Sequence, residues 1–411
     1  MFLLFKVSAH DNAHNPERIS KHGAASSLAR SANWYTDVFA QGEKSLNYVL
    51  LFLLLLPVKL LLKLGHKKPK RNLVIQTAKI GDFINITPLL SHLERSDALL
   101  SRTVAPLAQH DATLDEIFYV EDFKTSTFSK LKLAFKLMNR YENVYLLHPN
   151  NINLFYAACC NADNKQFLSM YRRKWYQGIF YLTASGTVEH EKTSLTLENY
   201  LKLADRSLTK ESYPKHATLP LFKPDDTPPE VFRTDKIKIG LSISAGNQAK
   251  TIPPEIWKKF FDRLSTLPCL FYVFGAPNEL TRLNELNKVV GERDNIVNLI
   301  GKVSLEGLPY ALSQMDFYVA SDSGNVYIAD SQNVPVILIY GPCCVEEQRP
   351  LGDVLLIGPN HIAPSSFVFH ALYKFNHPVE QLFELDQRKL DDIYDFICAR
   401  TPQFAEKKTL S

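Results

Sequence analysis

The feature that most constrains the fold is a regular alternation of apolar runs and helical patterns in the second half of the chain. Residues 237–242, 270–274, 317–320 and 336–340 are short, apolar and rich in β-branched or aromatic side chains. Segments with apolar residues at helical spacing separate them, as in 253–267. Strands that alternate with helices imply a parallel, doubly wound sheet.

The first half shows the same alternation, starting with a strand, turn and helix over residues 72–90. A length of 411 residues also favours two domains or more. The polar, proline-rich segment 223–229 is the best linker in the chain. We therefore predict an α/β protein in which two Rossmann-like, doubly wound domains face a central cleft. The predicted divisions are 1–69, 70–225, 226–375 and 376–411.

Several function classes lose support from composition and motifs. A net charge of +4 is too small for a nucleic-acid binder. The six cysteines show no C-x-x-C spacing, so reduced thiols in a cytosolic environment are the plain interpretation. There is no G-x-G-x-x-G after a strand, no G-x-x-x-x-G-K-[ST], no G-x-S-x-G and no H-E-x-x-H. Dehydrogenases, P-loop enzymes, serine hydrolases and zincins are therefore disfavoured.

The leucine-rich segment 46–64 is followed at once by the basic run 66–71. Lys59 and Lys63 lie on one helical face, from which both could reach lipid headgroups. The combination favours a membrane-inserted helix on the cytoplasmic side of an anionic leaflet. Two alternatives stay open, a buried core helix and a single tilted span interrupted by Pro57. No signal peptide is recognisable in residues 1–44.

Asp82 is the candidate catalytic residue, because it stands where the first strand turns into the first helix. Such a helix entrance lies at the carboxyl edge of the sheet, where ligands bind. The helix dipole and the free backbone N–H groups favour the ionised carboxylate there. Asp82 could serve as a base toward a substrate hydroxyl, or it could simply cap the helix.

Three loops at the corresponding edge of the second domain carry polar residues. Lys250 ends the first loop and could hold a phosphate, and Glu279 in the second could accept both hydroxyls of a ribose. The third loop, 321–325, precedes a short helix whose free N–H groups would bind an anion, and Gly324 would allow a diphosphate to approach closely. Together the three loops favour a nucleotide diphosphate ligand.

A basic, irregular segment over residues 161–195 is the candidate acceptor side. Clustered arginines suit phosphate or carboxylate recognition through paired hydrogen bonds. A solvated surface loop is the alternative for any one of these residues. The candidates are Arg172, Arg173, Lys174 and His190.

With these motifs in place, the chain resembles the bacterial heptosyltransferases, which are inverting glycosyltransferases of family 9 with the two-domain GT-B fold. The similarity runs from residue 70 to about residue 360. The chain departs from the family pattern at several positions; Tyr327 replaces a histidine, Ser323 a threonine and Ile252 a tryptophan. The loop 242–246 replaces an H-P-G-A-type loop, and the long leading segment is not typical of the family. The segments that carry the resemblance are 73–90 with its I-G-D and T-P-L-L motifs, 239–254, 298–305, 320–341 and 350–352.

The resemblance implies a role for each candidate residue. Asp82 would be the general base, Lys250 would neutralise the departing diphosphate, and Glu279 would hold the ribose. The donor would be ADP-heptose and the acceptor a lipid-linked saccharide of the lipopolysaccharide core, at the cytoplasmic face of the inner membrane, with no metal and no other cofactor. The last helix would pack back on the first domain. The donor sugar and its diphosphate would be bound by Asp322, Ser323, Gly324 and Asn325.

Other functions remain open on these residues. The closest is transfer of another sugar, a hexose or an N-acetylhexosamine, onto outer core or a surface glycan. An epimerase of the same fold is weaker, because it would not need the membrane segment. A catalytically silent protein that binds the membrane surface belongs to a different class, and there Asp82 would only cap its helix.

Overall fold

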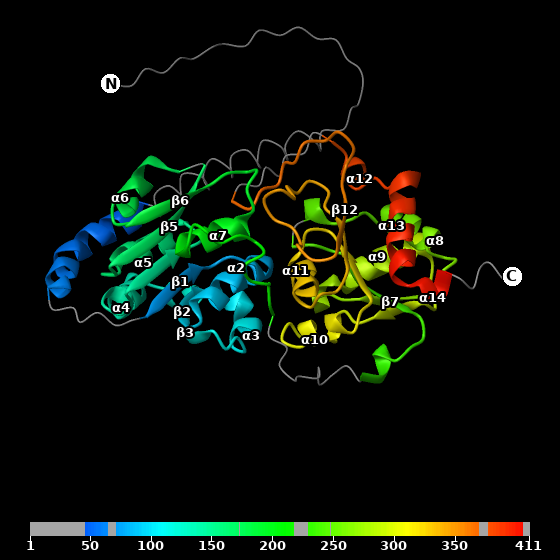
Figure 1. Cartoon of the computed structure of the whole chain (residues 1–411), viewed down its shortest axis with the longest axis horizontal. Coiled ribbons are helices and arrows are strands. Elements are labelled where there is room, and N and C mark those ends of the chain that lie inside the picture. The colour runs from blue at the N-terminus through cyan, green and yellow to red at the C-terminus, as the bar shows by residue number, and fades with distance from the viewer. Residues whose placement is uncertain are drawn as a thin grey trace, which may run out of the picture.

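Two parallel α/β sheets stand side by side in the computed structural model of the chain (Figure 1). The structure describes residues 46–64, 71–171, 173–217, 229–246, 248–369 and 377–405. The predicted linker, 223–229, lies almost entirely outside these ranges. Within them, the prediction of two doubly wound parallel sheets is confirmed.

The first sheet has six strands in the order β3-β2-β1-β4-β5-β6, and every neighbouring pair is parallel. Its central strands are buried on both faces, as strands covered by helices on each side must be. The strands are β1 (Asn72–Gln76), β2 (Ser96–Leu100), β3 (Leu114–Tyr119), β4 (Asn143–Leu146), β5 (Asn164–Met170) and β6 (Gly186–His190). The helices are α2 (Ile80–Leu93), η1 (Arg102–Val104), α3 (Ala105–Ala108), η2 (Val120–Phe123), α4 (Thr127–Met138), α5 (Asn151–Cys159), η3 (Trp175–Gln177), α6 (Gly178–Tyr181) and α7 (Thr196–Ala204).

The second sheet repeats the same topology, with strands in the order β12-β11-β10-β7-β8-β9, again all parallel. The strands are β7 (Ile237–Ser242), β8 (Cys269–Val273), β9 (Ile296–Asn298), β10 (Phe317–Ala320), β11 (Val336–Ile339) and β12 (Val354–Ile357). The helices are η4 (Pro229–Phe232), η5 (Gln248–Lys250), α8 (Pro254–Arg263), η6 (Pro277–Glu279), α9 (Leu280–Val290), α10 (Leu308–Ser313), α11 (Gly324–Ser331), α12 (Val379–Leu382), α13 (Gln387–Arg400) and α14 (Pro402–Ala405).

Each sheet therefore has one point where the strand order reverses. In the first sheet it lies between β1 and β4, and in the second between β7 and β10. Ligands of doubly wound proteins bind outside the carboxyl ends of the strands at these reversals. Helices α2 and α11, which follow β1 and β10, pack against each other between the two halves, and one apolar cluster runs through both.

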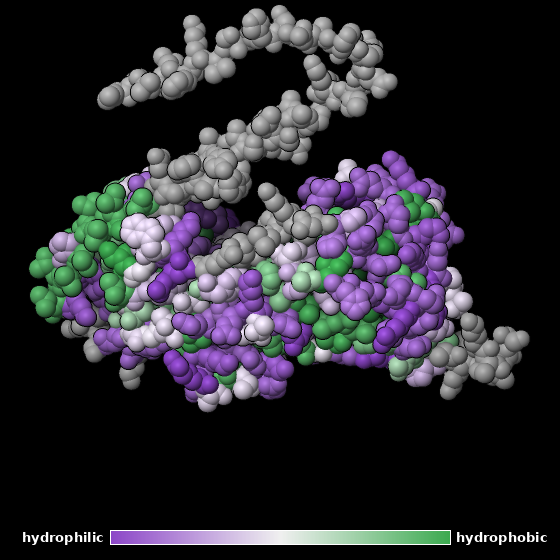
Figure 2. Space-filling view, turned by 90° about the horizontal axis from the view of Figure 1, so that it is seen from above, coloured by the Kyte–Doolittle hydropathy of each residue, from purple (hydrophilic) through white to green (hydrophobic). Residues whose placement is uncertain are grey.

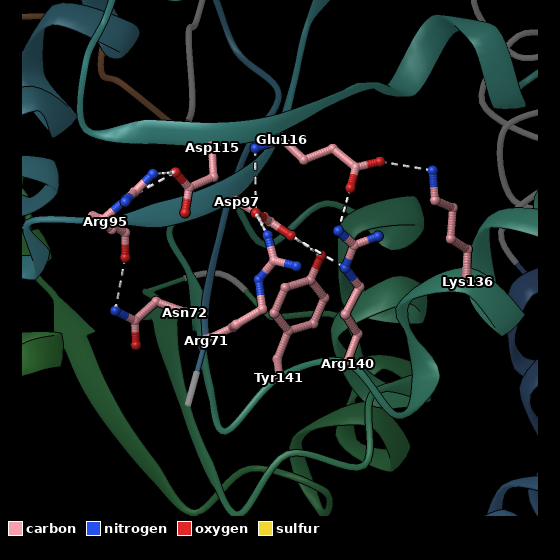
Figure 3. Close-up of polar contacts among 9 residues, drawn as sticks. All are labelled: Arg71, Asn72, Arg95, Asp97, Asp115, Glu116, Lys136, Arg140 and Tyr141. Carbon is pink, nitrogen blue, oxygen red and sulfur yellow. Dashed lines mark hydrogen bonds and ion pairs between the residues drawn. The ribbon is translucent and has the colours of Figure 1, made fainter. Parts of the chain in front are cut away.

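The amino ends of β1 and β2 are tied together by a charged cluster around Asp97, whose side chain is fully buried (Figure 3). Its carboxylate accepts hydrogen bonds from Arg71 Nη2 at 2.7 Å, from the Tyr141 hydroxyl at 2.8 Å and from the backbone N–H of Glu116 at 3.2 Å, and it pairs with Arg140. A buried carboxylate requires this full set of partners. The cluster anchors the start of β1, which leads to Asp82.

The prediction that the last helix packs back on the first domain is wrong. Helix α13 lies on the second half, against α8 and β12. Its apolar residues Leu390, Ile393 and Ile397 are buried in the cluster that covers the outer face of that sheet. Arg263 pairs with Asp391 at 3.0 Å and fixes α13 beside α8. The apolar face of α13 thus packs into the core of the second half, to which α13 is closest in the sequence, and not onto the first half.

The apolar segment of the sequence forms a helix, Leu46–Lys63, which lies along the first half of the molecule. Its length and composition would allow it to cross a membrane, and most of its surface is exposed. The expectation that Lys59 reaches lipid headgroups is wrong, since Lys59 is buried and its Nζ donates to Asn161 Oδ1 at 2.9 Å. Lys63 is exposed, as predicted.

Candidate active site

The two strand-order reversals meet at the amino ends of α2 and α11. A Cβ added to Gly81 would lie 2.7 Å from the ring of Tyr327, and one added to Gly324 would lie 2.8 Å from Cβ of Ile80. Both distances are shorter than real side chains tolerate. The two glycines therefore let two helix starts approach closely, and their unpaired N–H groups and positive dipole ends face one region.

Asp82 occupies the third position of α2 within this region. Its Oδ2 accepts a hydrogen bond from the backbone N–H of Lys79 at 3.1 Å, which caps the helix. The pKa of Asp82 is raised from 3.8 to about 6. Burial is the largest cause and the nearby carboxylate of Asp322 adds to it, while the hydrogen bond from the N–H of Lys79 and the ammonium of Lys250 oppose both effects. A carboxylate with a pKa near 6 is ionised at neutral pH and is basic enough to accept a proton in catalysis.

Lys250 and Asp322 form an ion pair across the opposite side of the region, with Nζ 2.6 Å from Oδ2. The Tyr327 hydroxyl donates to the other oxygen, Oδ1, at 2.7 Å. Burial pushes the pKa of Asp322 up, but the charge of Lys250 and these hydrogen bonds outweigh it and leave the pKa lowered. Burial lowers the pKa of Lys250, but the negative charge of Asp322 outweighs burial, so the pKa of Lys250 is raised. Both groups are thus charged and held in place.

Two polar atoms beside this pair are buried without a hydrogen-bond partner in the described part of the chain. They are Oγ of Ser323, directly before α11, and Oε1 of Gln348, whose amide nitrogen approaches Gly81. Buried polar atoms usually have a hydrogen-bond partner, so these two atoms are suited to bind a polar ligand at this helix start. An anion at the start of α11 would accept a hydrogen bond from the Ser323 hydroxyl.

Asn325 has a supporting position. Its Nδ2 donates to Oγ of Ser242 at 3.0 Å, and Ser242 in turn contacts the Tyr318 hydroxyl at 2.6 Å. These bonds join the start of α11 to the end of β7. Asn325 therefore helps to fix the shape of the region.

Glu279 lies in a separate polar pocket of about 470 Å³, between the loop after β7 and the start of α9. Its carboxylate stands directly beside Gly275, where a Cβ would lie 2.5 Å from Oε2. Lys79 connects this pocket with Asp82, because its Nζ lies 3.6 Å from the Cβ position of Gly246. The pocket is lined by Ser244, Ala245, Gly246, Gln248, Thr251, Asn278, Glu279, Thr281, Arg282 and Glu285.

The predicted acceptor residues do not gather around Asp82. Arg173 is exposed, with its guanidinium carbon 4.8 Å from the centre of the Tyr181 ring, and it lines an apolar pocket beside the leading helix. Lys174 lies next to it, before η3, with Nζ 5.9 Å from the Tyr176 ring. Arg172 lies outside the described residues.

His190 is not available to a substrate. It is buried, and its Nε2 lies 2.6 Å from Oε1 of Glu347, while its Nδ1 accepts from Nδ2 of Asn199 at 2.9 Å. Because Glu347 belongs to the second half of the chain, His190 ties the two halves together. The prediction of an acceptor-binding role for this side chain is wrong for that reason.

Sequence reasoning did not assign a role to Lys79, Tyr327 or Cys343. The Cys343 thiol lies beside Lys250 and Asp322, and burial together with the Asp322 charge raises its pKa. No sequence motif predicts a role for any of these three residues, although the tyrosine at 327, in place of the family's histidine, was a sign that this position differs. Among the described residues, no group of three or more His, Cys, Asp or Glu side chains could hold a metal ion.

Comparisons with known proteins identify the family of the chain. The profile of glycosyltransferase family 9 (heptosyltransferase) matches residues 132–366. Lipooligosaccharide heptosyltransferase 2 of Haemophilus influenzae is 25% identical over 202 residues, a stretch that covers 45% of this chain and 58% of that protein. The chain thus matches little more than half the length of this relative.

Two solved structures share the fold. ADP-heptose lipopolysaccharide heptosyltransferase II of E. coli is 16% identical, with a TM-score of 0.60, over 80% of this chain and 99% of that one. The E. coli heptosyltransferase WaaC, with ADP-2-deoxy-2-fluoro heptose, is 18% identical, with a TM-score of 0.54, over 79% and 99%. Both likenesses concern the two-sheet architecture. Since the family profile covers more than half of its residues, the chain belongs to glycosyltransferase family 9, the heptosyltransferases.

Proposed function

We propose that the protein transfers a heptose from ADP-heptose to a saccharide acceptor of the lipopolysaccharide core, with inversion at the anomeric carbon. The observation that carries this proposal is the position of Asp82 near the Lys250–Asp322 ion pair, where two helix starts face each other. One side offers a base, and the other offers positive charge and free N–H groups for an anion.

The donor would lie across the second half of the chain. Its diphosphate would sit at the start of α11, where the orphaned Ser323 hydroxyl and the N–H groups of Gly324 and Asn325 can donate to phosphate oxygens. Lys250 would share its charge between Asp322 and the diphosphate. The nucleoside would occupy the polar pocket, with Glu279 accepting the ribose hydroxyls.

The reaction follows from this placement. The Asp82 carboxylate removes the proton of the acceptor hydroxyl, and that oxygen attacks the anomeric carbon. The bond between this carbon and the diphosphate oxygen breaks, and its electron pair leaves with ADP. Lys250 and the start of α11 stabilise the negative charge that develops on the leaving group. Attack from the face opposite the diphosphate inverts the anomeric centre.

The acceptor would approach from the membrane side. Arg173 and Lys174 lie beside the exposed leading helix, where a lipid-linked saccharide carrying phosphates or carboxylates would arrive. This arrangement supports a location at the cytoplasmic face of the inner membrane. The basic residues would hold the lipid-proximal part of the acceptor, and Asp82 would meet its hydroxyl.

The test is a product analysis with the full-length protein. The protein is incubated with ADP-heptose, ADP-glucose, UDP-N-acetylglucosamine or GDP-mannose, together with lipopolysaccharide truncated at successive core positions. Mass spectrometry should find the addition of one heptose with ADP-heptose only. Addition of a hexose or N-acetylhexosamine would replace the donor assignment, and absence of any product with all donors would refute the proposal.

A further inference from the structure

A continuous apolar surface lies at the end of the molecule that carries the leading helix, and Figure 2 shows hydrophobic residues gathered there. Trp175 and Leu182, at either end of the η3–α6 segment, are each 86% exposed and lie across a shared hollow from the leading helix. Soluble proteins rarely expose an apolar patch of this extent without a partner. We call the helix and this segment the insertion surface; its exposed leucines on the helix are Leu46, Leu50, Leu53, Leu54, Leu60, Leu61 and Leu62.

The leading helix is attached to the protein along one face. Phe52 and Leu55 are buried in the cluster that includes α4 and α5, and Lys59, one turn further on, is buried as well. Lys59 Nζ donates to Oδ1 of Asn161, and Nδ2 of Asn161 donates back to the carbonyl of Lys59 at 3.0 Å. This reciprocal pair fixes the rotation of the helix, so its leucines face outward.

The attachment extends over nearly the whole helix. Near its start, the ring of Tyr48 lies 5.8 Å from that of Phe155, and near its end Nδ2 of Asn139 donates to the carbonyl of Leu62 at 3.0 Å. At a rise of about 1.5 Å per residue, these contacts are roughly 20 Å apart along the axis. A helix crossing the bilayer in this pose would carry the flanking α4, with its lysines, into the hydrocarbon region, which is costly.

The surroundings of the surface are basic. The segment 46–64 contains no acidic residue, and its Lys63 is exposed. Arg173 lines a hollow of about 650 Å³ between the leading helix and α6, whose other lining residues are mostly apolar. Apolar residues rimmed by cations match an anionic lipid leaflet, with acyl chains against the leucines and phosphates against the basic groups.

We propose that the insertion surface embeds in one leaflet of an anionic bilayer, with the leading helix parallel to the membrane plane and not spanning it. Trp175 and Leu182 enter the leaflet beside the helix, and acyl chains fill the hollow between them. This inference goes beyond sugar transfer and does not depend on it, because membrane binding can be measured without a donor or an acceptor.

Vesicle flotation of the full-length protein tests the surface. Wild type should float with vesicles of phosphatidylethanolamine and phosphatidylglycerol, and the triple variant Leu54→Gln, Leu61→Gln, Leu182→Gln should bind at least tenfold more weakly. Leu280→Gln is the matched control, because Leu280 is an exposed leucine of the second half. Arg173→Gln should weaken binding about fivefold on anionic vesicles and leave binding to neutral vesicles unchanged.

Unchanged melting temperatures would show that all the variants remain folded, and the triple variant should also keep its activity on a delipidated, soluble acceptor. Wild-type protein that fails to float, or a triple variant that floats as well as wild type, would overturn the proposal.

Two further measurements distinguish a helix in the plane of the membrane from a helix that spans it. Brominated lipids should quench tryptophan fluorescence in wild type and much less in Trp175→Phe, and an amino-terminal epitope should stay open to protease from the side of the catalytic domains. An epitope protected inside the vesicle would show a span and refute the proposal.

Discussion

Replacing Asp82 by asparagine separates a catalytic base from a structural cap. Asparagine keeps an oxygen that can accept the N–H of Lys79, so the hydrogen bond at the start of α2 survives. It cannot accept a proton from a hydroxyl. We therefore expect kcat to fall by about 10² to 10⁴-fold, the usual contribution of a general base, with the donor KM nearly unchanged.

The structure also gives the sign and size of the effect on stability. The difference between a pKa of 3.8 and one of about 6 corresponds to roughly 3 kcal/mol. Because the folded pKa is the higher one, the folded state binds more protons, and stability falls as pH rises from about 4 to about 6. Asp82→Asn removes this cost, so at pH 7.5 the variant should be more stable than wild type by up to about 3 kcal/mol.

Chemical denaturation at pH 7.5 and pH 3.5, combined with a pH–rate profile, is the assay. The gain in stability should be present at pH 7.5 and absent at pH 3.5. The wild-type rate should fall as the pH is lowered, with an apparent pKa near 6. Glu198→Gln is the matched control, since Glu198 holds the same third position in α7. A variant that loses stability at pH 7.5 and keeps its turnover would refute the reasoning, because that result identifies a cap.

Three more substitutions test the donor side. Lys250→Met leaves the Asp322 carboxylate without its cation, and we expect a loss of about 2 kcal/mol in urea unfolding and a raised donor KM. Ser323→Ala removes an unpaired hydroxyl, so the melting temperature should stay constant while calorimetry shows ADP binding weakened about fivefold. Gly324→Ala places a methyl 2.8 Å from Ile80 and should cost about 1–3 kcal/mol of stability, and normal stability would contradict the close approach of α2 and α11.

The sequence alone predicted the features that depend on local periodicity. Alternating strands and helices imply parallel sheets, and parallel strands place the loops that follow them at one edge. Asp82 follows β1 and Asp322 follows β10, so both were expected at the carboxyl edges of the two sheets. That β1 and β10 lie at the order reversals was seen only in the structure.

The misplaced residues depend on neighbours that are distant in the sequence. Lys59 belongs to an apolar helix, yet Asn161, 102 residues further on, supplies the partner that allows it to be buried. His190 belongs to a basic segment, yet its ring nitrogen Nε2 hydrogen-bonds to Glu347 of the other half. The packing of α13 against α8 was not predictable for a similar reason. The apolar periodicity of α13 shows that one face is buried, but it does not show whether that face packs on the first or the second half.

In the mechanism that we propose, one half of the protein holds the diphosphate while Asp82 of the other half faces the anomeric carbon. A structure of the protein with ADP and a fluorinated, unreactive ADP-heptose tests it most directly. We predict that the phosphates lie against Lys250, Ser323 and the start of α11, and that the Asp82 carboxylate lies on the face of the sugar opposite the diphosphate. Phosphates bound elsewhere, or a sugar turned away from Asp82, would contradict the account.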